Sequence, residues 1–324
     1  MNVLLVGLGR WGEKHLRVLG EVGATVWIAD VSAERRRWAL AHGVNAAHAV
    51  DDYRAALADV EAVDVVTPAD SHLTIAEACL RAGKHCFVEK PLTRTVGEAR
   101  RLLAAAREMG RVVQVGHIFR FHPVTAAVEE ALHAGRVGAI RYATGRFSGF
   151  KRPRTDVGVF QTDGIHYVDL FRTLLRRDPT AVSALQRDFL GRGLDDLSVA
   201  IVHYGDVPVV IEANYFVPGT HRECVIVGEK GSLVADYGAQ TLTLYSGTHD
   251  RTAAGWEAVD AGKEELPVAG AEPLRLELEA FLAACAGRRD PAVTAADGLV
   301  AVEVAEAAQR SAALGRLVML TELR

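Results

Sequence analysis

The sequence predicts an α/β protein in which a doubly wound parallel-sheet domain precedes an α+β domain with an open-faced, mainly antiparallel sheet. In residues 1–116, short and continuously apolar segments alternate with helical patterns. In residues 117–324, longer segments with alternating polarity follow one another. Strands covered on both faces lack that alternation, whereas strands with one open face show it. A glycine-rich loop directly after the first apolar segment is the third indication.

The strands of the first half are short, and helix signals separate them. Ser32 can cap one helix, and Thr95 with Glu98 fits a capping box for another. Gly43 and Gly83 are placed to end helices. We predict strands at residues 3–6, 25–29, 63–66, 85–88 and 112–115, and helices at 10–22, 32–42, 74–81 and 95–109.

The second half reads mainly as strands. Within residues 209–216, Glu212 and Asn214 share one face, and the apolar residues between them share the other. We predict strands at 140–147, 180–189, 198–204, 209–216, 223–227 and 242–245, with helices at 124–134, 164–175 and 294–314. The predicted domains are residues 1–118 and residues 119–324.

Composition, net charge and cysteine spacing exclude several classes of protein. The chain has 324 residues, 49% of them hydrophobic, and a formal net charge of −4, which argues against a nucleic-acid-binding protein. We see no signal peptide and no apolar run long enough to span a membrane. The four cysteines form no C-x-x-C pair and no zinc pattern, so we predict a cytoplasmic protein with reduced thiols and no metal.

Residues 7–12 read GLGRWG and form a G-x-G-x-x-G motif with Gly7, Gly9 and Gly12. The motif follows a predicted strand and opens a helix, as dinucleotide binding in a Rossmann domain requires. The first glycine permits the turn, the second lets the backbone approach the pyrophosphate, and the third allows helix packing. We assign the loop residues Arg10 and Trp11 to the same cofactor site.

Asp30 ends the second predicted strand. A carboxylate there can accept both ribose hydroxyls and would repel a 2′-phosphate, so the sequence favours NAD over NADP. The alternative is a plain strand–turn–helix with Asp30 as a loop residue. Arg35, Arg36 and Arg37 follow, and we interpret them as a solvated helix face.

Residues 85–92 read HCFVEKPL, so Lys90 stands at the end of a strand and before Pro91. The proline favours an extended backbone at Lys90. Ligands of open α/β sheets bind beyond the carboxyl ends of the strands, where a lysine can bind a substrate hydroxyl. A structural Glu89–Lys90 pair is the alternative interpretation.

Five segments together resemble the Gfo/Idh/MocA oxidoreductase family, in the family's order: GLGRWGEKHLRVL, TPADSH, AGKHCFVEKPL, VGHIFRFHP and GIHYVD. The resemblance implies a Rossmann domain, an open-faced sheet and NAD(P)-dependent chemistry on sugars, nucleotide sugars or cyclitols. It implies that Lys90 lies between nicotinamide and substrate, and that the Lys90–Pro91 peptide is cis. Thr67, Pro68 and His72 would line the cofactor, and Glu89 would face its nicotinamide end.

The segment GIHYVDLFRTLL predicts an amphipathic helix with His166, Asp169 and Thr173 on its polar face. A histidine there can simply be solvated, but the resemblance implies that His166 is the acid/base residue. Proximity to a helix N-terminus would favour its neutral form. The family has an aspartate four residues before the histidine, where this chain has Thr162; Asp163 is the candidate to replace it.

Three cations are candidates for substrate contact. Arg120 follows the first domain, and Lys151 and Arg154 lie in the basic segment KRPRTD. Arginine binds planar anions bidentately, so a diphosphate or uronate would fit, although a solvated loop is the alternative. The segments GHIFRF and RPRTDVGVF also resemble the branch that acts on UDP-N-acetyl amino sugars at the 3-hydroxyl.

The sequence therefore predicts an NAD-dependent oxidoreductase that moves a hydride between nicotinamide and a carbinol or keto carbon of a sugar or nucleotide sugar. Lys90, His166 and Asp163 are the predicted catalytic residues. The alternatives are a cyclitol or ketosugar reductase, an NAD-dependent glycosidase, and a non-catalytic NAD sensor. The resemblance also implies a homodimer or homotetramer.

Overall fold

The computed structural model describes residues 1–323 and divides into two compact units. The first unit contains Met1–Ile118 and Glu272–Val302, and the second contains Phe119–Ala271 and Glu303–Arg324. The sequence-based division placed residues 272–302 in the second domain, whereas contacts group them with the first. The reason is packing, because Leu274, Leu278 and Phe281 belong to the apolar core that also contains Phe87 of the parallel sheet.

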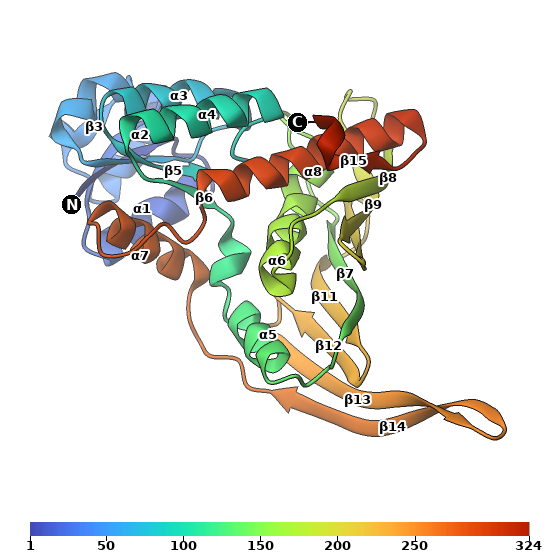
Figure 1. The fold of residues 1–324 in the computed structure, drawn as a ribbon. Helices are drawn as coiled ribbons and strands as arrows, with labels where there is room; N and C mark the ends of the chain where they lie inside the picture. Colours follow the sequence, from blue (N-terminus) through green and yellow to red (C-terminus); the bar gives the residue numbers. More distant parts are fainter. Residues whose placement is uncertain (324) are drawn as a thin grey trace. The chain divides into compact units, whose positions relative to one another are not determined.

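The first unit is built on a six-stranded parallel sheet with the order β3-β2-β1-β4-β5-β6. In this unit α3 packs beside α4, and α1 packs beside α7 (Figure 1). The strands are β1 Asn2–Val6, β2 Thr25–Ala29, β3 Ala49–Val50, β4 Ala62–Val65, β5 His85–Glu89 and β6 Val113–Gly116. The helices are α1 Gly12–Glu21, α2 Ala33–Ala41, α3 Ala69–Arg81, α4 Val96–Met109 and α7 Pro273–Cys285, with short 3₁₀ turns at Ala46–His48 and Tyr53–Asp59.

The local signals explain these boundaries. The Ser32 side chain accepts a hydrogen bond from the backbone of Arg35 at the start of α2. Thr95 and Glu98 form the predicted capping box of α4. The strand order reverses beside β1, so the loops after β1 and β4 open at the switch point where dinucleotides bind in such sheets.

The second unit is built on a nine-stranded sheet with the order β14-β13-β12-β11-β7-β10-β9-β8-β15. Its pairs are antiparallel except β10 with β7, which confirms the predicted mainly antiparallel sheet. The strands are β7 Ile140–Gly149, β8 Ala181–Arg187, β9 Leu197–Tyr204, β10 Val207–Asn214, β11 Thr220–Gly228, β12 Gly231–Asp236, β13 Thr241–Thr252, β14 Gly255–Leu266 and β15 Val318–Met319.

Helices cover one face of this second sheet. α5 Pro123–His133 packs on β12 and β13, and α6 Ile165–Leu175 packs on β9 and β10 (Figure 1). Five residues of the opposite face lie in register across neighbouring strands and are partly exposed: Ile201, Val210, Thr144, Val225 and Val234. Helix α8 Ala295–Leu314 crosses the division, and a 3₁₀ turn at Leu320–Leu323 follows β15.

Candidate functional site

The glycine loop has the geometry that its motif predicts. Gly7 has φ +98°, and a Cβ there would lie 2.6 Å from the carbonyl oxygen of Val66. A Cβ on Gly12 would lie 2.1 Å from the carbonyl oxygen of Gly7. Gly9 instead faces open space. The first and third glycines are therefore required by packing, and the second leaves the loop open to a ligand.

Asp30 lies directly after β2 and next to the glycine loop. Its Oδ2 accepts a hydrogen bond of 2.7 Å from the Leu8 backbone, and its Oδ1 accepts one of 2.8 Å from Ser32. Arg36 donates to the Asp30 carbonyl at 2.7 Å, and the Arg35 Nε donates to the Leu8 carbonyl at 2.6 Å. These two arginines therefore bind the loops instead of forming the solvated face that the sequence suggested.

These residues fit a dinucleotide. No side chain caps the N-terminus of α1, so its positive dipole end remains for a pyrophosphate. Gly9 faces open space, and the carboxylate of Asp30 bonds the backbone of Leu8, the residue next to Gly9. Contact of the adenosine diphosphate part of NAD by Gly7, Gly9, Arg10, Trp11, Gly12 and Asp30 stays a prediction.

The turn that carries Lys90 is fixed from several directions. The Lys90–Pro91 peptide bond is cis, as the family resemblance implied. The ring nitrogens of the buried His72 lie 2.9 Å from the carbonyl oxygens of Pro91 and Thr67. His72 thus joins the Lys90–Pro91 turn to the segment after β4. Cofactor contact by Thr67, Pro68 and His72 stays a prediction.

Below this turn, the first unit contains a cluster of buried charged side chains that the sequence analysis did not identify. His15 of α1 is fully buried, and its Nδ1 lies 2.8 Å from Oδ2 of Asp64 in β4. Its Nε2 lies 3.4 Å from Oε1 of Glu89, which also accepts a 2.8 Å hydrogen bond from Trp11 Nε1. The cluster therefore joins α1, the glycine loop, β4 and the end of β5.

The protonation of the cluster follows from its geometry. Burial opposes the imidazolium of His15, but the charges and hydrogen bonds of Asp64 and Glu89 outweigh it and raise the pKa to about 10. Burial raises the pKa of Asp64 against the effect of His15. Burial would also raise the pKa of Glu89, but His15, Lys90 and Trp11 together lower it. A signal was available in the sequence, because His15 follows Gly12 by three positions and so lies on the same side of α1.

In the second unit, a π-helical turn at Phe160–Gly164 leads directly into α6. Asp195 holds its start by accepting a 2.9 Å hydrogen bond from the backbone of Phe160. A Cβ on Gly145 of β7 would lie 2.5 Å from the Tyr167 ring, so glycine is needed for α6 to pack there. His166 thus lies inside a continuous helical segment and not at a free helix N-terminus, so the predicted dipole effect does not apply.

His166 is buried among aromatic rings. Its ring stacks on Phe119 at a centroid distance of 4.8 Å and on Phe147 at 5.5 Å. The polar face predicted for α6 is not solvated, because His166 and Asp169 are 5% and 1% exposed. The structure therefore encloses this histidine, which gives its ring a fixed orientation.

Asp163 and Thr162 point to different partners. The Asp163 carboxylate is 3% exposed and lies 2.7 Å from Nζ of Lys151. Thr162 donates its hydroxyl to the Gly158 carbonyl at 2.8 Å, within its own helical turn. Asp163 is thus the buried carboxylate at this position, paired with a predicted substrate cation. Its catalytic role remains a prediction.

The other predicted cations have different surroundings. Arg120 forms a bidentate pair with the buried Asp169, with N–O distances of 2.8 and 2.6 Å, which gives Asp169 a structural role. Arg154 pairs with Asp156, and its Nε donates to Oδ1 at 2.8 Å. Substrate contacts by Arg120, Lys151 and Arg154 therefore stay predictions.

Cations also gather on aromatic rings near His166. Lys151 Nζ lies 4.7 Å from the centroid of the Phe147 ring and 5.6 Å from that of Tyr215. The guanidinium groups of Arg222 and Arg192 lie over the same two rings, at 4.7 Å and 5.9 Å respectively. Burial, followed by the charge of Asp163, raises the pKa of Tyr215 to about 12, so its hydroxyl is neutral at physiological pH. The sequence analysis did not identify Tyr215, Arg192 or Arg222, since each lies far along the chain from His166.

Two models of one oxidoreductase family match the chain. The model described as an NAD-binding Rossmann fold matches residues 1–117, and the model described as the C-terminal alpha/beta domain matches residues 129–320. The chain belongs to the Gfo/Idh/MocA family of oxidoreductases. It is therefore an NAD-dependent oxidoreductase, and the fold described above is the family's fold.

Several relatives are named enzymes. Inositol 2-dehydrogenase 1 of Saccharopolyspora erythraea is 31% identical over 96% of this chain and 94% of its own length. UDP-N-acetylglucosamine 3-dehydrogenase of Acidithiobacillus ferrooxidans is 35% identical over 57% of this chain and 58% of its own length. The solved structure of that second enzyme matches 96% of this chain and 97% of its own, with a TM-score of 0.83 and 27% identity.

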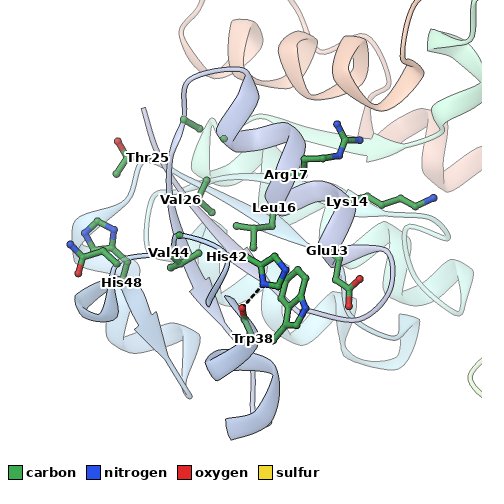
Figure 2. Close-up of a pocket in the computed structure, with 14 residues that line it drawn as sticks. Glu13, Lys14, Leu16, Arg17, Thr25, Val26, Trp38, His42, Val44 and His48 are labelled. Atoms are coloured by element: carbon green, nitrogen blue, oxygen red, sulfur yellow. Dashed lines mark hydrogen bonds between the residues drawn. The ribbon is translucent and has the colours of Figure 1, made fainter. Parts of the chain in front are cut away.

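A cavity of about 660 Å³ lies elsewhere in the first unit, along α1 and α2 (Figure 2). Trp38 and His42 stack at its wall with a centroid distance of 4.0 Å, and His42 Nδ1 lies 2.8 Å from the Trp38 carbonyl oxygen. None of the predicted cofactor residues lines it. Within residues 1–323 we find no cluster of metal-ligating side chains and no helix long and apolar enough to cross a membrane.

Proposed function

We propose that this oxidoreductase interconverts a carbinol and a keto carbon of a sugar, with a nucleotide sugar as the preferred class. The observation that carries the proposal is the buried His166 beside a carboxylate–cation pair, on a chain whose family binds NAD. The named activities of the relatives, which include inositol and UDP-N-acetylglucosamine dehydrogenases, support the same class of substrate.

NAD, when bound, supplies the hydride acceptor or donor. His166 accepts the hydroxyl proton of the substrate as the general base, and Lys90 donates a hydrogen bond to the substrate oxygen as negative charge develops. In the reverse direction either His166 or Lys90 acts as the acid and gives one proton to the substrate oxygen. Asp163 keeps Lys151 oriented beside the aromatic rings.

The cations of the second unit favour an anionic substrate. Lys151, Arg192 and Arg222 lie over the Phe147 and Tyr215 rings, and of these three cations Lys151 also pairs with the carboxylate of Asp163. A sugar carrying a diphosphate or a carboxylate would satisfy such a group. This feature favours UDP-linked sugars over inositol as substrates.

A panel assay tests the proposal. The full chain is incubated with NAD and, separately, with free sugars, inositol, uronates and UDP-linked sugars, while NADH absorbance is followed. NADH formation with a UDP-linked sugar or a uronate is expected. Aglycone release without net NADH would indicate a glycosidase instead, and NAD binding without any turnover would indicate a sensor.

We also infer that the open face of the second sheet pairs two copies of the chain. Ile201 and Val234 are 39% and 36% exposed, and they lie in one registered row with the aliphatic Val210 and Val225. Ile201→Lys should convert a homodimer or homotetramer to a smaller species in sedimentation analysis. An unchanged mass in Ile201→Lys and Val234→Lys would contradict this interface.

We further propose a cytoplasmic location. The four cysteines, Cys79, Cys86, Cys224 and Cys285, are all free thiols. Burial raises the pKa of Cys224 and Cys285, which keeps both thiols protonated and unreactive. Such thiols suit a reducing compartment.

A further inference from the structure

His15 has no role in the proposed proton transfer, yet it is a fully buried charged group of the first unit. It is fully buried, as is Asp64, and Glu89 is 7% exposed. Two carboxylates in a dry pocket would repel each other without a cation between them. His15 is placed to be that cation, because each of its ring nitrogens faces one carboxylate.

Glu89 is held on several sides. Oε1 accepts the hydrogen bond of Trp11 Nε1, and Oε2 accepts one of 3.1 Å from the backbone N–H of Lys90. Gly116 of β6 leaves room for it, because a Cβ there would lie 2.7 Å from Oε1. Both carboxylate oxygens of Glu89 thus accept hydrogen bonds inside the first unit, one from Trp11 of the glycine loop and one from the backbone of Lys90.

Trp11 links this cluster to the loop surface. It lies between the second and third glycines of the motif, and its ring contacts His15 edge-on at a centroid distance of 5.8 Å. Phe87 of β5 contacts the other side of His15 at 5.7 Å. The imidazole is therefore fixed by rings as well as by carboxylates.

We propose that His15 is a positioning residue for NAD binding: held between Asp64 and Glu89, it fixes the Glu89 carboxylate, which in turn sets both Trp11 of the glycine loop and the backbone of Lys90. The interpretation that Glu89 faces the nicotinamide end stays a prediction beside this internal role. The inference rests on NAD binding and not on the sugar, so a failed substrate panel would leave it standing.

Calorimetric titration of the full chain with NAD⁺ and with NADH tests the proposal. His15→Gln keeps a polar side chain but removes the charge, and it should weaken binding of both forms about tenfold. Asp64→Asn, which removes one partner and keeps the shape, should weaken binding by a smaller factor. It also serves as the second variant if His15→Gln does not fold.

Leu80→Ala is the matched control, because Leu80 is buried in α3 and has no part in the cluster. It should lower the melting temperature as much as His15→Gln while leaving both dissociation constants within about twofold. Equal losses of NAD affinity in Leu80→Ala and His15→Gln would mean that His15 stabilises the fold and does not position the NAD site. Wild-type affinity in folded His15→Gln or Asp64→Asn would overturn the proposal directly.

Discussion

Two buried histidines of this protein lie in opposite surroundings. His15 of the first unit faces two carboxylates, whereas His166 of the second unit lies against the rings of Phe119 and Phe147. Carboxylates hold an imidazole by charge and fix its protonated form. Ring stacking fixes the orientation of an imidazole but not its protonation state. A general base must change its protonation state in every turnover, so His166 is suited to proton transfer and His15 to holding a structure.

The largest expected effect concerns turnover. His166→Ala and Lys90→Ala should each reduce kcat by roughly 100-fold or more, since each removes a group proposed to handle the substrate proton or oxygen. NADH affinity should stay nearly unchanged in His166→Ala, which lies outside the NAD-binding unit. Steady-state kinetics on the substrate found by the panel, with NADH titrations, measure both. Near-normal turnover in the two variants would remove the distinction between the histidines.

The second prediction concerns pH and the stability of the first unit. The pKa of His15 is raised from 6.5 to about 10, so the stabilisation by its charge is complete below pH 6.5 and is lost as pH rises toward 10. Breaking such a buried pair typically costs about 3–5 kcal/mol. Urea unfolding of wild type and His15→Gln should therefore show a stability difference that shrinks between pH 6.5 and 9. A constant difference would mean that His15 is not held as an imidazolium.

A smaller effect is expected from Asp163. Asp163→Asn removes the charge that pairs with Lys151, so we expect kcat to fall about tenfold, in line with the loss of one charged hydrogen bond. Thr162→Ala is the comparison variant, because Thr162 is the neighbour of Asp163 in the same helical turn but carries no charge. If Thr162→Ala lowers kcat as much as Asp163→Asn, then Asp163 has no special role beside His166.

The difference between contacts among neighbours in the chain and contacts between distant segments explains which features the sequence could predict. Local patterns predicted the parallel strands other than β3, the Thr95–Glu98 capping box and the glycine loop, because these depend on neighbours along the chain. The polar β14 was missed, since Gly255–Leu266 is almost entirely exposed and has no apolar alternation. Helix α7 was missed although its Leu274, Leu278 and Phe281 have helical spacing.

Of the candidate site, the sequence predicted single residues better than their partners. Gly7, Gly9 and Gly12 have the expected surroundings because their motif is contiguous. Asp30 follows a different strand, and its carboxylate bonds the backbone of Leu8 in the glycine loop. The partners of His15 lie 49 residues away at Asp64 and further on at Glu89, and only the order of the strands brings them together. The rings around His166 come from different elements in the same way, so spacing along the chain carries no signal for them.

The smallest expected effect on turnover comes from a variant that changes cofactor choice. This variant leaves both histidines unchanged. Asp30→Ser removes the carboxylate that would repel a 2′-phosphate, while Arg36, which donates to the Asp30 carbonyl, remains. The ratio of the NADP⁺ to the NAD⁺ dissociation constant should fall about tenfold, equal to about 1.4 kcal/mol. At saturating cofactor, kcat should stay close to that of wild type, because His166 and Lys90 are untouched. An unchanged ratio would show that Asp30 serves only the backbone of Leu8 and Ser32, with which it already bonds.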